Sequence, residues 1–248
     1  MSFIKKIMNS ASLQRNEVSA VILAAGLGER FGNEDGTKQN ALVGGIPALA
    51  RCALVFEECG MIKEVVIVAR EDEIPTVEGY VKDFDLKKVS CVVAGGATRQ
   101  ESSEIGFYAS SDKCRYVAIH DAARCLVTTE IIERTLIEAF KHGAAAAAER
   151  VTDTVKVATD GGFIDHTEDR ERVWLVKTPQ AFKRSVYETA LALSKRDGIA
   201  VTDDCMMAEH AGLRVKLVDC GRENIKLTER EDLGLAEYIL SKREDKEV

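Results

Sequence analysis

The chain has 248 residues, of which 46% are hydrophobic and 30% are charged, and its formal net charge is −7. This length suits one large α/β domain or two small ones with a sizeable buried core. The negative charge argues against nucleic acid as a partner, so a local cluster of Arg and Lys must hold any anionic ligand.

No apolar run approaches the roughly 18 residues that a membrane-spanning helix needs, so we expect no membrane partner. Residues 1–17 lack a sustained apolar core and are expected to form a flexible tail rather than a secretion signal. We expect one domain over residues 18–240 and a frayed, charged end over 241–248. The seven cysteines are scattered and form no C-x-x-C pair, which favours reduced thiols in a cytoplasmic protein.

The first predicted strand, Val18 to Leu23, runs into a glycine-rich loop over residues 24–39. Such a transition can bring backbone N–H groups against a polyphosphate. Phe31 stands where the dinucleotide fingerprint needs a third glycine, and the Gly-Lys-Ser/Thr of the P-loop is absent. Arg30 and Lys38 suit a nucleotide whose phosphates react, because cations can follow the charge that develops during transfer. The alternative is a plain glycine turn.

Strand-like and helical runs alternate after this loop, which implies a mostly parallel sheet with helices on both faces. Ligands of such sheets bind beyond the carboxyl ends of the strands. We therefore expect the chemistry in residues 24–39, 94–99 and 121–124. The predicted strands are Glu64 to Ala69, Lys88 to Val93 and Arg115 to His120, and the predicted helices are Ile46 to Cys59, Glu71 to Phe84, Thr98 to Ser110 and Thr128 to His142.

Two polar motifs follow the third and fourth predicted strands. After Gly95-Gly96, Arg99 and Ser102 would face one pocket from the first turn of a helix that Thr98 can cap. The alternative is an ordinary turn between strand and helix with a capping threonine.

The second motif, His120 to Arg124, places Asp121 at a strand end, where it would suit Mg²⁺. Arg124 would bind a phosphate. An ion pair between Asp121 and Arg124 that closes the turn is the alternative. For His120 we favour a hydrogen-bonded structural role over that of a catalytic base.

The alternation breaks after the run Ala144 to Ala148. Residues 149–177 read as a β-hairpin that leaves the sheet, with a turn at Asp160 to Gly162. A thin hairpin has little core of its own, so a second subunit is expected to pack on it. The remaining predicted elements are helices at Phe182 to Ser194 and Asp203 to Ala211, a strand at Leu213 to Val218, and a helix from Thr228 to Leu240 with Thr228 and Glu231 as a capping box.

The order of the motifs is more specific than any one of them, and it resembles the 2-C-methyl-D-erythritol 4-phosphate cytidylyltransferase family. The resemblance covers about Val18 to Leu240. The motifs are Ala24-Ala25-Gly26-x-Gly28-x-Arg30, Lys38-Gln39, Gly95-Gly96, Arg99-Gln100, His120-Asp121-Ala122-Ala123-Arg124, Asp153-Thr154, Thr178-Pro179-Gln180, Asp203-Asp204 and Asn224-Ile225-Lys226.

The resemblance implies a Rossmann-like, GT-A-like nucleotidyltransferase domain with a protruding β-arm that makes a homodimer. It implies that CTP and the polyol phosphate become diphosphocytidyl-methylerythritol and pyrophosphate, with Mg²⁺ as cofactor. By position, Arg30 and Lys38 would be catalytic and Asp121 would hold the metal. The implied nucleotide-binding residues are Ala24, Ala25, Gly26, Gly28, Gly96, Arg99 and Ser102. The implied residues for the sugar phosphate are Arg124, Thr154, Thr178, Lys226 and, reaching the partner subunit, Arg170.

The chain departs from the family pattern at Thr37 and Cys125, where proline is usual, at Lys177, where glutamine is usual, and over Ser103 to Phe107. Three alternatives stand beside the leading interpretation. They are a cytidylyltransferase for another polyol phosphate such as D-ribitol 5-phosphate, a non-catalytic nucleotide-binding paralogue, and an NAD-type oxidoreductase, which Phe31 disfavours.

Overall fold

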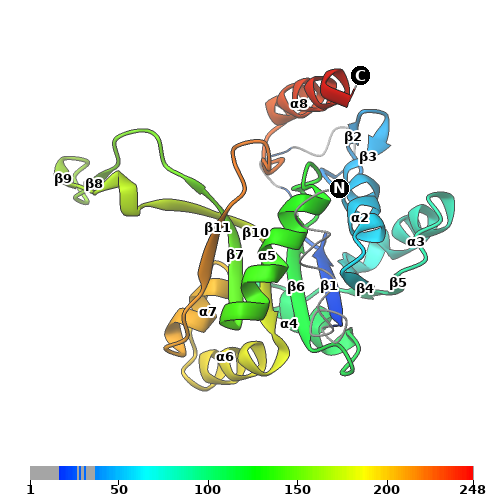
Figure 1. The fold of residues 1–248 in the computed structure, drawn as a ribbon, viewed down its shortest axis with the longest axis horizontal. Coiled ribbons are helices and arrows are strands. Elements are labelled where there is room, and N and C mark those ends of the chain that lie inside the picture. The colour runs from blue at the N-terminus through cyan, green and yellow to red at the C-terminus, as the bar shows by residue number, and fades with distance from the viewer. Residues whose placement is uncertain (1–16, 27, 29–30, 32–36, 248) are drawn as a thin grey trace.

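A mostly parallel sheet forms the centre of the protein, as predicted (Figure 1). The computed structural model describes residues 17–26, 28, 31 and 37–247. Seven strands have the order β11-β7-β10-β6-β1-β4-β5, and β10 alone is antiparallel to its neighbours β6 and β7. They are β1 (Val18–Leu23), β4 (Ile62–Ala69), β5 (Val89–Ala94), β6 (Tyr116–Asp121), β7 (Ala144–Arg150), β10 (Trp174–Lys183) and β11 (Lys216–Asp219).

Helices cover both faces of this sheet, because its central strands alternate between two apolar cores. Ala20 and Ile22 of β1 belong to one core, and Val21 belongs to the other. The first core takes side chains from α2 (Ala48–Glu58), α3 (Ile74–Asp83), α5 (Thr129–His142) and α8 (Glu231–Glu247), and the second from α4 (Arg99–Ala109), α6 (Arg184–Arg196) and α7 (Asp204–His210). The prediction of helices on both faces is therefore confirmed.

The alanine run 144–148 forms β7, although the sequence predicts no strand there. Alanine favours helices, but burial on both sides overrides this weak preference. Ala144 and Ala146 enter one core and Ala145 and Ala147 the other, which is the period of a strand. Strands β10 and β11 pair with β7 along both of its edges.

The last helix differs from the prediction at both ends. It begins at Glu231, and the capping box is wrong: Asp232 Oδ2 accepts hydrogen bonds from the N–H groups of Thr228 (2.6 Å) and Glu229 (2.9 Å). It ends at Glu247, seven residues beyond the predicted end at Leu240. Arg243 anchors this end, because its guanidinium donates to Leu126 O (3.0 Å) and to Glu223 Oε2 (3.1 Å).

A two-stranded arm leaves the sheet between β7 and β10 and extends away from the body (Figure 1). It consists of β8 (Lys156–Ala158), β9 (Ile164–Thr167) and the short helix η4 (Arg170–Arg172). Phe163 and Ile164 are 77% and 65% exposed at its tip. At its base the Arg150 guanidinium lies 4.3 Å from the ring centre of Trp174. The predicted hairpin excursion is thus present.

Two short strands, β2 (Leu42–Val43) and β3 (Ile46–Pro47), lead into α2, and the short helix η3 (Glu71–Glu73) follows β4. Among the residues that the structure describes, no helix has the length and apolar character needed to cross a membrane.

Candidate active site

A pocket of about 550 Å³ opens at the carboxyl ends of β1, β4, β5 and β6. This is the edge at which parallel α/β sheets bind ligands. Most of its lining comes from the segments that directly follow these strands. The lining residues are Leu23, Ala25, Gly26, Lys38, Gln39, Arg70, Glu71, Asp72, Gly95, Gly96, Ala97, Thr98, Arg99, Ser102, Asp121, Ala123 and Lys226.

Gln39 contacts the first residues that follow β1. The buried Gln39 side chain donates from Nε2 to Ala24 O (2.6 Å) and to Gly26 O (3.0 Å). The Lys38 stem runs beside Gly28, where a Cβ would lie 3.5 Å from Lys38 Cδ. Gly28 has a φ of +65°, which a residue with a side chain rarely adopts. Lys38 thus lines the pocket beside Gly28.

The opposite wall is the turn between β5 and α4, where close packing requires glycine. A Cβ on Gly95 would collide with Ala25 Cβ and with Ser102 Oγ. Ser102 Oγ accepts from Gly96 N (3.2 Å) and donates to Thr98 O (2.9 Å). Thr98 caps α4 by accepting a hydrogen bond from Glu101 N. The turn is therefore both a capped helix start and part of the pocket wall, rather than one or the other. This turn lines the pocket from Gly95 to Arg99.

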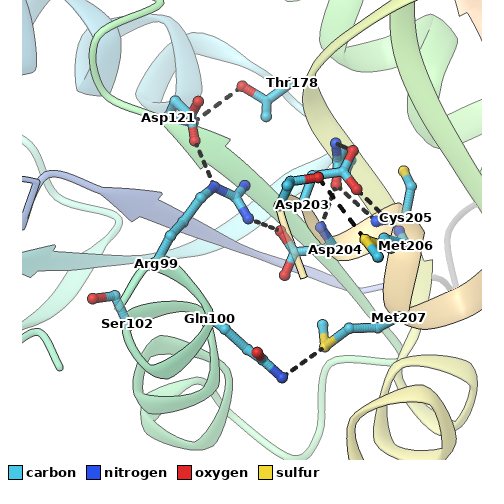
Figure 2. A network of polar contacts seen from close by, with 12 residues as sticks. Arg99, Gln100, Ser102, Asp121, Thr178, Asp203, Asp204, Cys205, Met206 and Met207 are labelled. Carbon is cyan, nitrogen blue, oxygen red and sulfur yellow. Dashed lines mark hydrogen bonds and ion pairs between the residues drawn. The ribbon is translucent and has the colours of Figure 1, made fainter. Parts of the chain in front are cut away.

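Asp121 lines the pocket and pairs with two cations, Arg99 and Lys226; Figure 2 shows its contact with Arg99. Lys226 Nζ lies 2.8 Å from Asp121 Oδ2, and Arg99 Nε lies 3.3 Å from Oδ1. Burial alone would raise the pKa of the Asp121 carboxyl, but the charges of Arg99 and Lys226 hold it well below its usual range. Asp121 therefore remains ionised. The alternative ion pair with Arg124 is not formed, because Arg124 Nη1 donates to Asn224 O (3.1 Å).

A chain of hydrogen bonds behind the pocket fixes the end of β6. His120 Nε2 lies 3.3 Å from Arg124 O, which can only accept, so this nitrogen carries the proton. Nδ1 then accepts from the Thr178 hydroxyl at 3.0 Å, and that oxygen accepts from Asp121 N at 3.1 Å. His120 is fully buried with both ring nitrogens engaged, as expected for a structural histidine.

We expect His120 to make stability depend on pH. Burial lowers the pKa of His120 to about 4, whereas the unfolded chain should titrate near 6.5. The unfolded state then binds more protons between these values, so the stability is present above about pH 6.5 and is lost as pH falls towards 4. By about pH 5 the loss is roughly 2 kcal/mol. Urea unfolding at about pH 6.5 and about pH 5 should show this loss of unfolding free energy for the wild type and a smaller loss for His120→Asn. Equal losses in the two proteins would contradict the assignment of the pH dependence to His120.

The pocket brings together part of the predicted site. Ala24, Gly28, Arg124 and Thr178 lie behind or beside the lining. Thr154 and Arg170 are exposed on the arm, and Arg30 lies outside the described residues. The predicted site residues that line the pocket are Ala25, Gly26, Lys38, Gly96, Arg99, Ser102, Asp121 and Lys226.

Sequence reasoning missed the wall formed by Arg70, Glu71 and Asp72. Arg70 and Asp72 form a two-pronged ion pair, with Nε–Oδ1 at 3.0 Å and Nη2–Oδ2 at 2.8 Å. The signal for this wall was available. These residues follow β4, a predicted strand whose carboxyl end lies at the same edge as those of β1 and β5.

Two departures from the family pattern have partners of their own. Thr37 Oγ1 donates to Glu73 Oε1 at 2.6 Å, which ties the Lys38 loop to η3. Lys177 is 8% exposed at the base of the arm and pairs with Glu149 at 2.7 Å. Both replacements are therefore accommodated by polar contacts within the chain.

Known proteins match this chain over nearly its whole length. A family model described as 2-C-methyl-D-erythritol 4-phosphate cytidylyltransferase matches residues 18–242. The enzyme of that name from Alkaliphilus oremlandii is 37% identical over 93% of this chain and 98% of its own length. That from Caldanaerobacter subterraneus is 38% identical over 91% and 99%.

Solved structures agree. The 4-diphosphocytidyl-2C-methyl-D-erythritol synthase from Anaerococcus prevotii has a TM-score of 0.81 at 28% identity, covering 91% of this chain and 99% of that one. The cytidylyltransferase from Thermus thermophilus has a TM-score of 0.72 at 31% identity, covering 90% and 98%.

Proposed function

Because the chain belongs to the 2-C-methyl-D-erythritol 4-phosphate cytidylyltransferase (IspD) family, we propose that it transfers the cytidylyl group of CTP to that polyol phosphate. The observation that carries the proposal is the pocket at the strand ends, which is lined by Lys38, Arg99 and Lys226 and in which Arg99 and Lys226 pair with Asp121. Lysine and arginine side chains that line one pocket suit a ligand with several phosphates.

In the proposed reaction a phosphate oxygen of the polyol phosphate attacks the α-phosphorus of CTP. A new P–O bond forms as the bond to pyrophosphate breaks. The attacking phosphate is ionised at neutral pH, so no strong general base is needed. This agrees with the pocket, where the nearby His120 is buried and engaged on both nitrogens. Positioning and charge stabilisation supply the catalysis, with Lys38 and Arg30 assigned to the α-phosphate.

We assign the cytosine and ribose to the part of the pocket lined by Ala25, Gly26, Gly96 and Ser102, where glycine leaves room for close approach of a ligand to the backbone. We assign the sugar phosphate to the opposite end, where Lys226 lines the pocket and Arg124 and Thr178 lie just behind Asp121. In this arrangement Lys226 can turn from Asp121 to the substrate without leaving Asp121 unpaired, because Arg99 remains.

Mg²⁺ is proposed as the cofactor, with Asp121 as its protein ligand. Within the described part of the chain no group of three or more His, Cys, Asp or Glu side chains is suited to a metal. One carboxylate in a phosphate-binding pocket nevertheless fits, since magnesium takes one or two carboxylates and completes its shell with substrate phosphates and water. When bound, the ion would neutralise charge on the triphosphate.

We further propose a cytoplasmic homodimer held by the arm. The seven cysteines are all free, as expected in a reducing compartment. The arm has no core of its own and exposes Phe163 and Ile164, which a second subunit would cover. Thr154 and Arg170 are exposed on the same arm, and in a dimer Arg170 would reach the pocket of the partner subunit.

A mixing experiment tests this arm assignment. Arg170→Ala and Lys38→Ala homodimers should both be inactive, but random mixing gives about half heterodimers, each with one intact site. We therefore expect about one quarter of the wild-type rate after mixing. The matched control mixes Lys38→Ala with Asp121→Asn. Both residues belong to the pocket of their own subunit, so each site of the mixed dimer lacks one of them and the mixture should stay inactive. If both mixtures are inactive, Arg170 does not act across the dimer.

A pyrophosphate-release assay tests the function itself. The wild-type protein with CTP and Mg²⁺ should turn over 2-C-methyl-D-erythritol 4-phosphate and not D-ribitol 5-phosphate. Turnover with D-ribitol 5-phosphate but not with 2-C-methyl-D-erythritol 4-phosphate would overturn the proposed substrate. Binding of CTP without turnover on either would indicate a nucleotide-binding paralogue.

A further inference from the structure

Asp204, at the start of α7, lies directly behind the pocket residue Arg99 (Figure 2). Its Oδ2 is 2.7 Å from Arg99 Nη1, which is shorter than the 3.3 Å contact between Arg99 Nε and Asp121. Asp204 is 1% exposed and does not line the pocket. The acid nearest to Arg99 is therefore one that no ligand in the pocket can touch.

Asp204 is itself held on every side. Its Oδ1 accepts from the Tyr187 hydroxyl at 2.8 Å, and its N–H donates to Gln180 Oε1 at 3.0 Å. Gln180 Nε2 donates in turn to Asp203 Oδ2 at 2.8 Å, and Asp203 caps α7. Burial raises the pKa of Tyr187 well above its usual value, so the tyrosine remains a donor. The carboxylate is thus a fixed anchor rather than a mobile surface acid.

Arg99 bridges this anchor to Asp121. Burial alone would lower the pKa of its guanidinium, but the carboxylates of Asp204 and Asp121 hold it above the usual value. The third guanidinium nitrogen, Nη2, is buried without a hydrogen-bond partner among the described residues. Two of the three guanidinium nitrogens therefore contact carboxylates. The contacts of Arg99 with Asp204 and Asp121 fix the position of Asp121 Oδ1.

We propose that Asp204 is a positioning residue that holds Arg99 against Asp121 and thereby fixes the Asp121 carboxylate in the nucleotide pocket. This inference rests on the proposed function. Without the negative charge of Asp204, Arg99 would move to pair more fully with Asp121 or with the phosphates of CTP. Either movement displaces Asp121 and Lys226 from their present contacts. A displacement of about 1 Å in a reacting site costs up to about 10²-fold in rate.

The test compares Asp204→Asn with Tyr187→Phe. Both variants remove one interaction of the same buried anchor, but only the first removes the charge that faces Arg99. We expect Asp204→Asn to lower kcat/KM for CTP by about 10- to 100-fold and CTP affinity by about tenfold. Tyr187→Phe should stay within about threefold of wild type in both, although its melting temperature falls. Equal kinetic losses in the two variants would show a structural role only and overturn the proposal.

A double-mutant cycle with Arg99→Gln keeps the test valid if Asp204→Asn folds poorly. The double variant carries no unpaired buried charge, so it should be more stable than Arg99→Gln alone. If Asp204 acts through Arg99, adding Asp204→Asn to Arg99→Gln should change kcat/KM by less than about twofold. Additive losses would contradict the proposal.

CTP binding by calorimetry, without the second substrate, separates this inference from the proposed function. A wild type that binds CTP but releases no pyrophosphate overturns the function alone, and the ratio of CTP affinities between Asp204→Asn and Tyr187→Phe still decides the role of Asp204.

Discussion

Replacement of Lys38 by alanine should lower kcat on the order of 10²–10³-fold while CTP affinity stays within about tenfold. The Lys38 stem packs beside Gly28, and the side chain of the neighbouring Gln39 donates to Ala24 O and Gly26 O, so Lys38 lines the pocket from a backbone position that is tied to the end of β1. Charge on the α-phosphate grows as pyrophosphate leaves. A preorganised cation therefore contributes more in the transition state than in the ground state.

Steady-state kinetics and CTP binding of Lys38→Ala measure the two effects separately. Lys63→Ala is the matched control, because Lys63 is exposed near the amino end of β4, far from the pocket edge. We expect this control to behave as wild type. Parallel losses in kcat and in CTP affinity would identify Lys38 as a ground-state binding residue instead.

Asp121→Asn should lower kcat/KM for CTP by at least about 10²-fold and destabilise the fold by on the order of 1 kcal/mol. The amide leaves Lys226 facing a neutral group and leaves Asp204 as the remaining carboxylate partner of Arg99. The stability loss comes chiefly from Arg99, since the Lys226 side chain is 37% exposed and solvent screens that pair. The activity falls for two reasons: Arg99 and Lys226 are misplaced, and the proposed metal ligand is lost.

Urea unfolding and a Mg²⁺ titration of the rate check both parts. Asp219→Asn is the control, because Asp219 is half-exposed on β11 and its nearest cation, Arg150, is 3.9 Å away. A variant at Asp121 with wild-type stability would show that the cluster is not maintained in solution. An unchanged Mg²⁺ dependence would argue against Asp121 as the ligand.

The elements with strong local signals were predictable. β1, β4 and β6 are β-branched runs buried on both faces, and α4 and α5 have threonine caps, Thr98 and Thr128, that accept the expected hydrogen bonds. The strand-end rule then located the pocket. Applied also to the end of β4, it would have included Arg70 and Asp72.

Other features depend on contacts that no local pattern encodes. The strand at 144–148 exists because β10 and β11 pair with it, and alanine alone favours a helix. Thr228 and Glu231 match a capping box, yet Asp232 takes that role by reaching back to two N–H groups. Asp204 reads as an acid at a helix N-terminus, and its pairing with Arg99 spans 105 residues of sequence.

The small side chains of β7 also limit how this family member can vary. Ala144 to Ala148 are each at most 1% exposed, with α5 on one side and the α6 core on the other. A larger residue at any of these positions must displace a neighbouring helix, unless a side chain of that helix is replaced by a smaller one. Substitutions in this strand are therefore expected to occur together with compensating substitutions in the helices packed on it. Only such coupled changes would preserve the packing of the sheet that holds β10 beside β6.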